Sequence, residues 1–76
     1  MFVFLPDQRL SFPYVNYRFE TSQRVVQFKG LDFGSNEWYP EEQWFMRCFD
    51  EEKNAYRSFA LKRINPRAII ILPPKA

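Results

Sequence analysis

Residues 44–64 constrain the fold most strongly, because they follow the pattern of a β-hairpin. An aromatic-rich run, 44–49, precedes the polar segment 50–54, and a second apolar and basic run occupies 56–64. A polar segment between two runs of this composition is typical of a hairpin turn. The sequence therefore predicts two neighbouring antiparallel strands in this part of the chain.

The second of these runs carries an unusual side-chain pattern. Arg57, Phe59, Leu61 and Arg63 recur at every second position, so an extended strand would place all four on one face. Two guanidinium groups around two apolar side chains do not suit a core. They do suit a flat anion, since guanidinium groups bind phosphate through paired hydrogen bonds and also stack on rings.

Short aromatic or β-branched segments recur along the whole chain and predict five strands. The predicted strands span residues 11–17, 24–33, 43–49, 56–61 and 68–72. Gly30, inside the second of them, predicts a bulge or tight bend that lets the sheet curl. We therefore expect residues 1–76 to form one all-β domain, a five-stranded antiparallel barrel, with 1–9 as an N-terminal extension and 73–76 as a tail.

The segment 68–72 is apolar on both strand faces, and Pro73 and Pro74 follow it. A strand of this kind is buried on both sides or becomes an aggregation-prone edge. We expect it to close the barrel or to pair with a second copy of the chain, which would give a homodimer.

The residue types present exclude several kinds of chemistry. The 76 residues include no histidine, one cysteine and two glycines. Without histidine the usual general base is missing, and with a single cysteine no structural zinc site can form within one chain. We therefore expect a protein that is not an enzyme and that needs no metal or cofactor.

Cysteine usage and hydropathy bear on the compartment. The single cysteine, Cys48, cannot form an internal disulfide, and its alternation with Trp44 and Met46 predicts an inert, buried thiol. No apolar run approaches the roughly 18 residues of a membrane helix. A small chain without disulfides is typical of a reducing compartment, so we expect a cytoplasmic protein that does not interact with membranes.

Charge is distributed unevenly along the chain. Six of the nine acidic residues lie between positions 37 and 52, whereas the residues after Glu52 include six basic ones and no acid. Such asymmetry can attract phosphate groups. A solvated basic face would produce the same pattern.

These segments together resemble the WYL domain family, which is named for a Trp-Tyr-Leu triplet at the start of one strand. Trp44, Phe45 and Met46 occupy the triplet. The family's later strand has the form Arg-x-Phe-x-Leu-x-x-Ile, which is matched by Arg57, Phe59, Leu61 and Ile64, with Arg63 preceding the last.

The resemblance extends upstream and covers residues 14–64. Residues 14–18 and 22–26 resemble the family's first hairpin, with its Tyr-x-Asn start and Ser-x-Arg signature, and 33–41 resembles a Gly-x-x-Glu-Trp-x-Pro subgroup. The chain departs from the family in several places. Phe45 and Met46 replace Tyr and Leu, Phe19 stands where the turn usually has Gly, and Phe28 stands where Pro is common.

The resemblance implies an SH3-like or Sm-like five-stranded barrel, in agreement with the five predicted strands. It also implies binding of nucleotide or nucleic-acid ligands. Family members are usually fused to a helix-turn-helix and act as ligand-responsive transcription regulators, often near phage-defence genes, while others modulate helicases or CRISPR effectors. This chain looks like a WYL module that stands alone.

The candidate ligand-binding residues are four arginines, a serine and two aromatic residues. They are Arg57, Arg63, Arg24, Arg47, Ser22, Tyr14 and Trp38. In the alternative interpretation the arginines pair with Glu20, Glu37 or Asp50 and solvate one face of the barrel. Tyr14 can lend a hydroxyl to a ligand or simply pack, and Ser22 can bind phosphate or stabilise a turn.

The two tryptophans are expected in different environments. Trp38 lies in the long connection between the second and third predicted strands, where it is either a stacking platform for a base or a packing residue. Trp44 lies near the start of a predicted strand, where it is either a stacking platform for a base or a core residue. We expect it in the core, because a small barrel needs large core side chains.

Two hypotheses of function follow. In the first, an arginine-rich face binds a nucleotide, an oligonucleotide signal or single-stranded nucleic acid, in a regulatory or defence-related role that includes sequestration of a defence signal. In the second, the barrel binds a protein partner through an edge strand or forms a dimer through residues 68–72.

Overall fold

The computed structural model describes residues 4–75, so residues 1–3 of the expected N-terminal extension and Ala76 of the expected tail lie outside the described part. The strands are β1 (Arg9–Val15), β2 (Thr21–Gly34), β3 (Gln43–Asp50), β4 (Ala55–Ala60) and β5 (Ile70–Ile71). Two short 3-10 turns, η1 (Leu61–Arg63) and η2 (Pro66–Ala68), connect β4 to β5.

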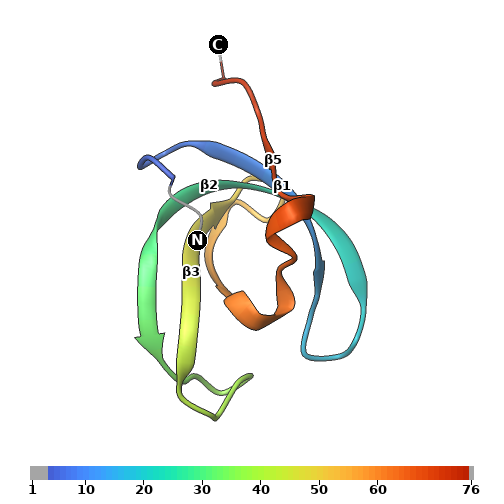
Figure 1. Cartoon of the computed structure of the whole chain (residues 1–76), viewed down its shortest axis with the longest axis vertical. Coiled ribbons are helices and arrows are strands. Elements are labelled where there is room, and N and C mark those ends of the chain that lie inside the picture. Colours follow the sequence, from blue (N-terminus) through green and yellow to red (C-terminus); the bar gives the residue numbers. More distant parts are fainter. Residues whose placement is uncertain (1–3, 76) are drawn as a thin grey trace.

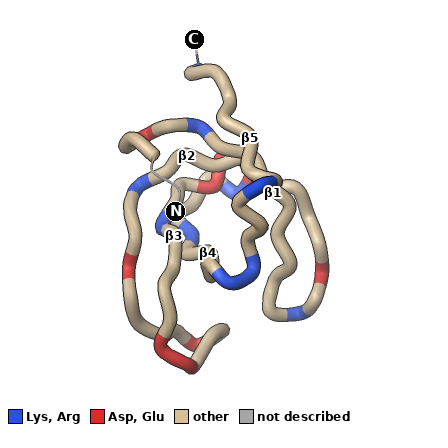
Figure 2. Tube along the Cα trace, in the orientation of Figure 1, with Lys and Arg blue, Asp and Glu red and all other residues tan. Residues whose placement is uncertain are grey.

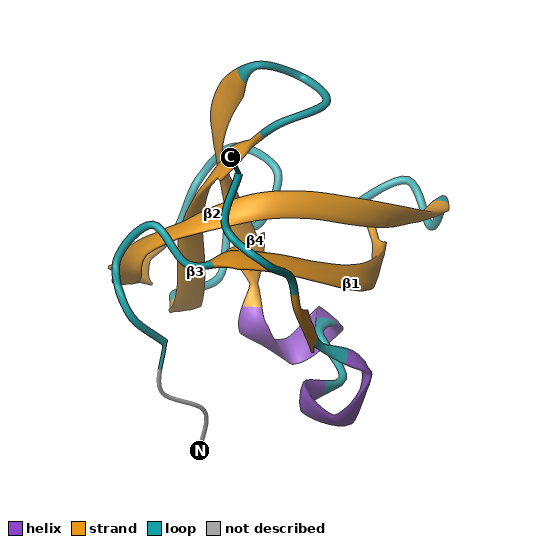
Figure 3. Ribbon diagram, turned by 90° about the horizontal axis from the view of Figure 1, so that it is seen from above, coloured by secondary structure: helices purple, strands orange, loops and turns teal. Residues whose placement is uncertain are grey.

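The strands form one antiparallel sheet in the order β4-β3-β2-β1-β5, which confirms the all-β prediction. The sheet curves around the η1–η2 segment (Figure 1). In the described residues β4 and β5 are the two edges and do not pair with each other, so the predicted barrel is not closed. Figure 3 shows why: the chain leaves β4 into the two turns on one side of the sheet before it reaches β5.

The last strand is shorter than predicted. The apolar segment 68–72 contributes only the pairs Leu10 with Ile71 and Ser11 with Ile70, because Ala68 belongs to η2 and Pro73 follows directly. Ile70 and Ile71 are 57% and 58% exposed. The expectation that this segment closes a barrel is therefore wrong, and a very short edge strand is one way in which proteins limit edge pairing.

The hairpin expected in residues 44–64 is present, but its second strand ends earlier than predicted. Met46 lies opposite Phe59 and Cys48 lies opposite Arg57, so Arg57 and Phe59 share the core-facing side of β4, as expected. After Ala60 the chain turns through η1. This turn brings Ile64 into the core, and it removes Leu61 and Arg63 from the strand face on which they were predicted.

The bulge predicted at Gly30 is confirmed. The register between β2 and β3 shifts between Phe28 and Gly30, which leaves Lys29 without an opposite residue. Gly30 has a φ of 158°, a conformation that residues with a side chain rarely adopt. The bulge bends the 14-residue β2, which pairs with β1 along its first half and with β3 mainly along its second.

The first turn lies earlier than predicted, since β1 ends at Val15. The side-chain oxygen of Asn16 accepts hydrogen bonds from the backbone N–H groups of Arg18 and Glu20, at 2.9 and 3.0 Å. Phe19 has a φ of 63°, so it occupies the left-handed position that glycine usually takes in such a turn.

The core lies on the concave side of the sheet. Its buried side chains are Leu10, Phe12, Tyr14, Val26, Met46, Cys48, Phe59 and Ile64. Phe12 and Tyr14 meet the ring of Phe59 edge to face, with centroids 5.4 and 4.9 Å apart. Cys48 is fully buried, as predicted, and burial raises the pKa of its thiol to about 12.

Trp44 is 52% exposed, so the expectation that it belongs to the core is wrong. It shares the face of Met46, but it lies opposite Phe33 near the end of the β2–β3 hairpin. The two rings contact each other, with centroids 5.3 Å apart. The alternation does place Trp44 on the face of Met46, but the buried core ends at Met46 and does not reach this end of the hairpin.

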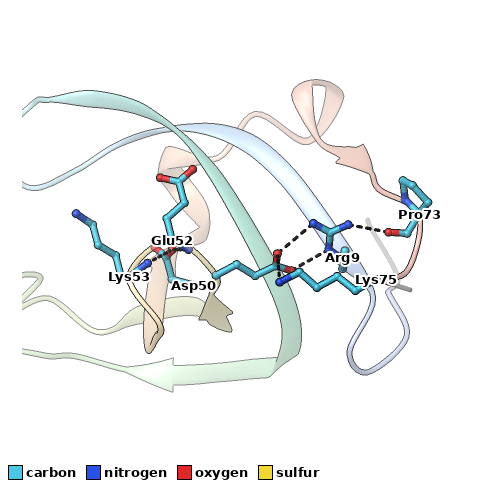
Figure 4. A network of polar contacts seen from close by, with 7 residues as sticks. Arg9, Asp50, Glu52, Lys53, Pro73 and Lys75 are labelled. Atoms are coloured by element: carbon cyan, nitrogen blue, oxygen red, sulfur yellow. Dashed lines mark hydrogen bonds and ion pairs between the residues drawn. The ribbon is translucent and has the colours of Figure 1, made fainter.

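Two acidic residues anchor the β3–β4 turn. Asp50 is buried, and its Oδ1 accepts hydrogen bonds from the backbone N–H groups of Glu52 and Lys53, at 3.0 and 3.1 Å (Figure 4). Glu51 receives two hydrogen bonds from the guanidinium of Arg9, at 2.9 and 3.0 Å. These contacts hold the turn against β1.

Candidate functional site

A groove of about 410 Å³ runs beside the free edge of β4. Its walls come from β4, from the end of the β1–β2 hairpin and from the connection between β2 and β3. Four of the seven predicted site residues line it, together with Tyr17 and Glu37, and we call it the β4 groove. The four are Tyr14, Arg24, Trp38 and Arg57.

The edge of β4 turns backbone polar groups toward this groove. The N–H of Ala60 donates to the Tyr14 hydroxyl, at 2.9 Å, rather than to β3. In an antiparallel ladder the residues that bond the neighbouring strand alternate with residues that do not. Tyr56 and Ser58 share the alternation of Ala60, so their N–H and C=O groups also point away from β3, on the side where both residues line the groove.

The Arg24 guanidinium lies inside the groove but is neutralised. Its Nη1 forms an ion pair with Asp50 Oδ2 at 3.4 Å, and the guanidinium lies 5.9 Å from the Tyr14 ring centroid and 5.6 Å from that of Phe59. Its Nε is buried without a hydrogen-bond partner. The pairing of an arginine with Asp50 is one of the alternatives that the sequence left open, and Arg24 chiefly stabilises the buried carboxylate.

Arg57 differs from Arg24 because its charge is not compensated. Its side chain is exposed and lines the β4 groove, and within residues 4–75 it forms no ion pair and no side-chain hydrogen bond. An exposed guanidinium with free donors is available to a phosphate or a carboxylate.

An aromatic pair forms part of the groove wall. The rings of Tyr17 and Trp38 are stacked, with centroids 4.6 Å apart and planes 25° apart, and Trp38 remains 50% exposed. The side chain of Asn36 orders this loop by accepting hydrogen bonds from the backbone N–H groups of Trp38 and Tyr39, at 2.9 and 2.8 Å. An asparagine two residues before Trp38 is a turn signal that the sequence contained.

Arg63 lies outside the β4 groove. Its Nη1 donates to the carbonyl oxygens of Val15 and Asn16, at 3.4 and 3.1 Å, and its guanidinium lies 5.3 Å from the ring centroids of both Phe19 and Tyr39. These contacts fasten η1 to the end of β1. The structure therefore separates Arg63 from Arg57, which were expected on one face.

A second depression, of about 340 Å³, shares Trp38 and Tyr39 with the β4 groove. We call it the η1 depression, because Lys62 and Arg63 of η1 line it together with Trp38, Tyr39 and Glu41. Lys62 is exposed and, in the described part of the chain, has no ion pair. In the sequence Lys62 belongs to a basic region, and no local signal predicts that it lines a depression together with Trp38.

Arg47 and Ser22 lie apart from both depressions. Arg47 lies opposite Gly30 and Ser58, on the face of β3 that points away from Met46 and the core, where its Nη1 forms an exposed ion pair with Asp32 at 3.2 Å. Ser22 is exposed near the start of β2.

Tyr14 lines the β4 groove, but its hydroxyl is occupied. It accepts from Ala60, as described above, and shares a hydrogen bond with the Tyr39 hydroxyl at 2.9 Å. Burial and this bond raise the pKa of Tyr14 above its ordinary value. Its hydroxyl therefore links β1 to β4 and to the loop.

The charges do not form a uniformly basic face. Figure 2 shows basic positions on the segment after β4 and acidic positions in the connection between β2 and β3. Glu37 lines the β4 groove with Arg57, and Glu41 lines the η1 depression with Lys62. Arg57 and Lys62 therefore each share a depression with one carboxylate.

No protein-family model, curated protein or solved structure matches this chain. Within residues 4–75 no group of three or more His, Cys, Asp or Glu side chains could hold a metal ion. The same residues contain no helix that is both long enough and apolar enough to cross a membrane.

Proposed function

We propose that this chain is a non-enzymatic, WYL-like binding module whose β4 groove takes a nucleotide or single-stranded nucleic acid. The observation that carries the proposal is the juxtaposition, in one groove, of the uncompensated Arg57 and the exposed ring of Trp38. A guanidinium and a stacking ring are the two elements that recognise a phosphate joined to a base. The curved sheet would then be an open variant of the SH3-like barrel.

The roles of the arginines differ in this proposal. Arg57 contacts the ligand phosphate, whereas Arg24 and Arg63 support the site, since Asp50 and two backbone carbonyls already occupy their donors. Trp38 stacks on the base and Tyr17 supports its other face. Stacking of this kind contributes roughly 1–3 kcal/mol per base.

Binding of fluorescently labelled nucleotides and single strands, at about 50 mM salt where phosphate contacts are strong, tests the proposal. Arg57→Ala should weaken binding about tenfold or more, as expected for the loss of a charge-assisted hydrogen bond. The matched control is Arg67→Ala, because Arg67 is exposed and lines neither depression. Equal affinity of wild type and Arg57→Ala for every probe would refute the proposal.

The biological part of the proposal is a regulatory or defence-related role in the cytoplasm, in which the module senses or sequesters a nucleotide signal. It is supported by the resemblance of residues 14–64 to the WYL family. Native mass spectrometry of protein purified from its host would report a bound nucleotide by mass together with the number of copies of the chain. Protein that carries no nucleotide and gains none when incubated with host extract would contradict this role.

A second candidate function, a protein-interaction module, is favoured by the free edge of β4. The outward N–H and C=O groups of Tyr56 and Ser58 can pair with an added strand, either from a partner or from a second copy. Ser58→Pro removes an edge donor that β3 does not use. If this function is correct, the substitution abolishes dimer formation or partner capture in light scattering; a wild type that is monomeric and captures no partner would exclude it.

A further inference from the structure

The β4 groove and the η1 depression share part of their lining. Trp38 and Tyr39 line both of them, so the indole ring stands at their junction. The two depressions therefore adjoin at the loop that precedes β3.

Each depression carries one exposed cation without an ion pair. Arg57 lies in the β4 groove and Lys62 in the η1 depression, and the two are separated by the end of β4 and the start of η1. A chain of five residues spans at most about 17 Å, which limits the distance between their Cα atoms. The surface therefore presents two exposed cations at separated points, with Trp38 between the depressions that hold them. Arg63 also lines the η1 depression, but it already donates to two backbone carbonyls.

The acidic residues in the two depressions limit how much negative charge a ligand can bring into either one. Glu37 shares the β4 groove with Arg57, and Glu41 shares the η1 depression with Lys62. A triphosphate would bring several negative charges into one depression beside a carboxylate, where like charges repel. A ligand with one phosphate per depression reduces this repulsion.

We propose that the two depressions form one track for a single-stranded oligonucleotide, with phosphates at Arg57 and Lys62 and a base stacked on Trp38 at the junction. This inference rests on the proposed function and names the polymer as its ligand. A mononucleotide carries its phosphate at one end and reaches one cation. A stacked single strand rises about 3.4 Å per nucleotide, so about five nucleotides cover the maximum separation of the two Cα atoms.

The salt dependence of binding counts the phosphates contacted, since each contributes about −0.7 to the slope of log K against log salt for a single strand. Hexathymidylate and thymidine monophosphate should be compared by fluorescence anisotropy and competition across a salt series. The hexamer should bind more tightly, with a slope of about −1.4, whereas the mononucleotide, which lacks the condensed counterions of a polyanion, should show a shallower slope. Trp38→Ala should weaken both roughly 5- to 150-fold.

Lys62→Ala tests the contribution of the η1 depression separately from that of the β4 groove. It should reduce the slope for the hexamer by about 0.7 and leave the affinity for the mononucleotide unchanged. Lys53→Ala is the matched control, because Lys53 is exposed in the β3–β4 turn and lines neither depression. Circular dichroism of each variant would confirm that the sheet is retained.

Three results would overturn the inference, and they are distinguishable. Equal affinities and slopes for mononucleotide and hexamer, with no effect of Lys62→Ala, would leave nucleotide binding in the β4 groove but exclude the track. Competition by a hexaglutamate peptide as strong as that by hexathymidylate would show that any flexible polyanion suffices. Binding of neither nucleic-acid probe would refute the inference and the proposed function together.

Discussion

Removal of the Tyr14 hydroxyl should destabilise this protein more than the loss of a single small polar group suggests. The hydroxyl accepts a hydrogen bond from the N–H of Ala60 at 2.9 Å and shares another with the Tyr39 hydroxyl. Ala60 is completely buried at the end of β4, and no strand lies beyond this edge in the described residues. The Tyr14 hydroxyl thus satisfies a buried donor that a closed barrel would pair with a neighbouring strand.

The magnitude follows from what Tyr14→Phe leaves behind. The ring keeps its contacts with Phe12 and Phe59, so little apolar packing is lost. The N–H of Ala60 loses its acceptor, and an unsatisfied buried donor costs about 1–3 kcal/mol. We therefore expect a loss of about 2 kcal/mol, which corresponds to a decrease in Tm of roughly 8–16 °C for a domain of this size.

Urea unfolding of Tyr14→Phe, Tyr39→Phe and the double variant measures this effect. Tyr39→Phe removes one bond to the Tyr14 hydroxyl but leaves the acceptor of Ala60 in place, so it should cost less than about 1 kcal/mol. An unchanged m-value would show that the difference lies in stability rather than in compactness. If Tyr14→Phe costs no more than Tyr39→Phe, the bond to Ala60 does not hold the edge of β4.

Three further predictions concern the bulge, the anchor of the β3–β4 turn and the buried thiol. Gly30→Ala should lower the free energy of unfolding in urea by about 1–3 kcal/mol, because a side chain strains this backbone conformation. The hydrogen bonds from Arg9 lower the pKa of Glu51, so the stability that this carboxylate contributes is present above its ordinary pKa of about 4.3 and is lost as the pH falls below it. Burial raises the pKa of Cys48 to about 12, so a thiol reagent at about pH 8 should label the native protein far more slowly than the urea-unfolded protein.

A specific measurement would contradict each of these three predictions. A Gly30→Ala variant as stable as wild type would mean that the bulge relaxes at no cost. Glu51→Gln should flatten the decrease in stability between about pH 5 and pH 3, and an unaltered pH profile would show that the contact with Arg9 contributes nothing. Labelling of Cys48 at the same rate in native and unfolded protein would contradict its burial.

Local features of the chain were predictable because they depend on neighbouring residues. The five strands follow from short runs of aromatic and β-branched residues, and the bulge follows from Gly30 inside a strand pattern. The burial of Cys48 follows from its alternation with Met46. The end of β4 was not predictable in this way, because η1 forms where the chain must turn to bury Ile64.

The roles of the arginines depended on residues far away in the sequence. Arg24 pairs with Asp50, 26 positions away, and Arg63 donates to the carbonyl of Val15, 48 positions away. Arg57 remains free because no acid lies across from it on β3, where Cys48 is its partner. Four equivalent guanidinium groups in the sequence therefore become one available binding group, two supports and one surface ion pair in the fold.

The sequence by itself determined that the chain forms short β-strands around an aromatic core, since alternation and residue shape act locally. Only the tertiary structure decided that the sheet remains open, that Trp44 lies outside the core, and that Trp38 stands between two depressions with one free cation each. The physical reason is that exposure and charge compensation are set by which distant segments meet. In this protein they meet along the edge of β4, where the η1–η2 segment takes the place of a closing strand.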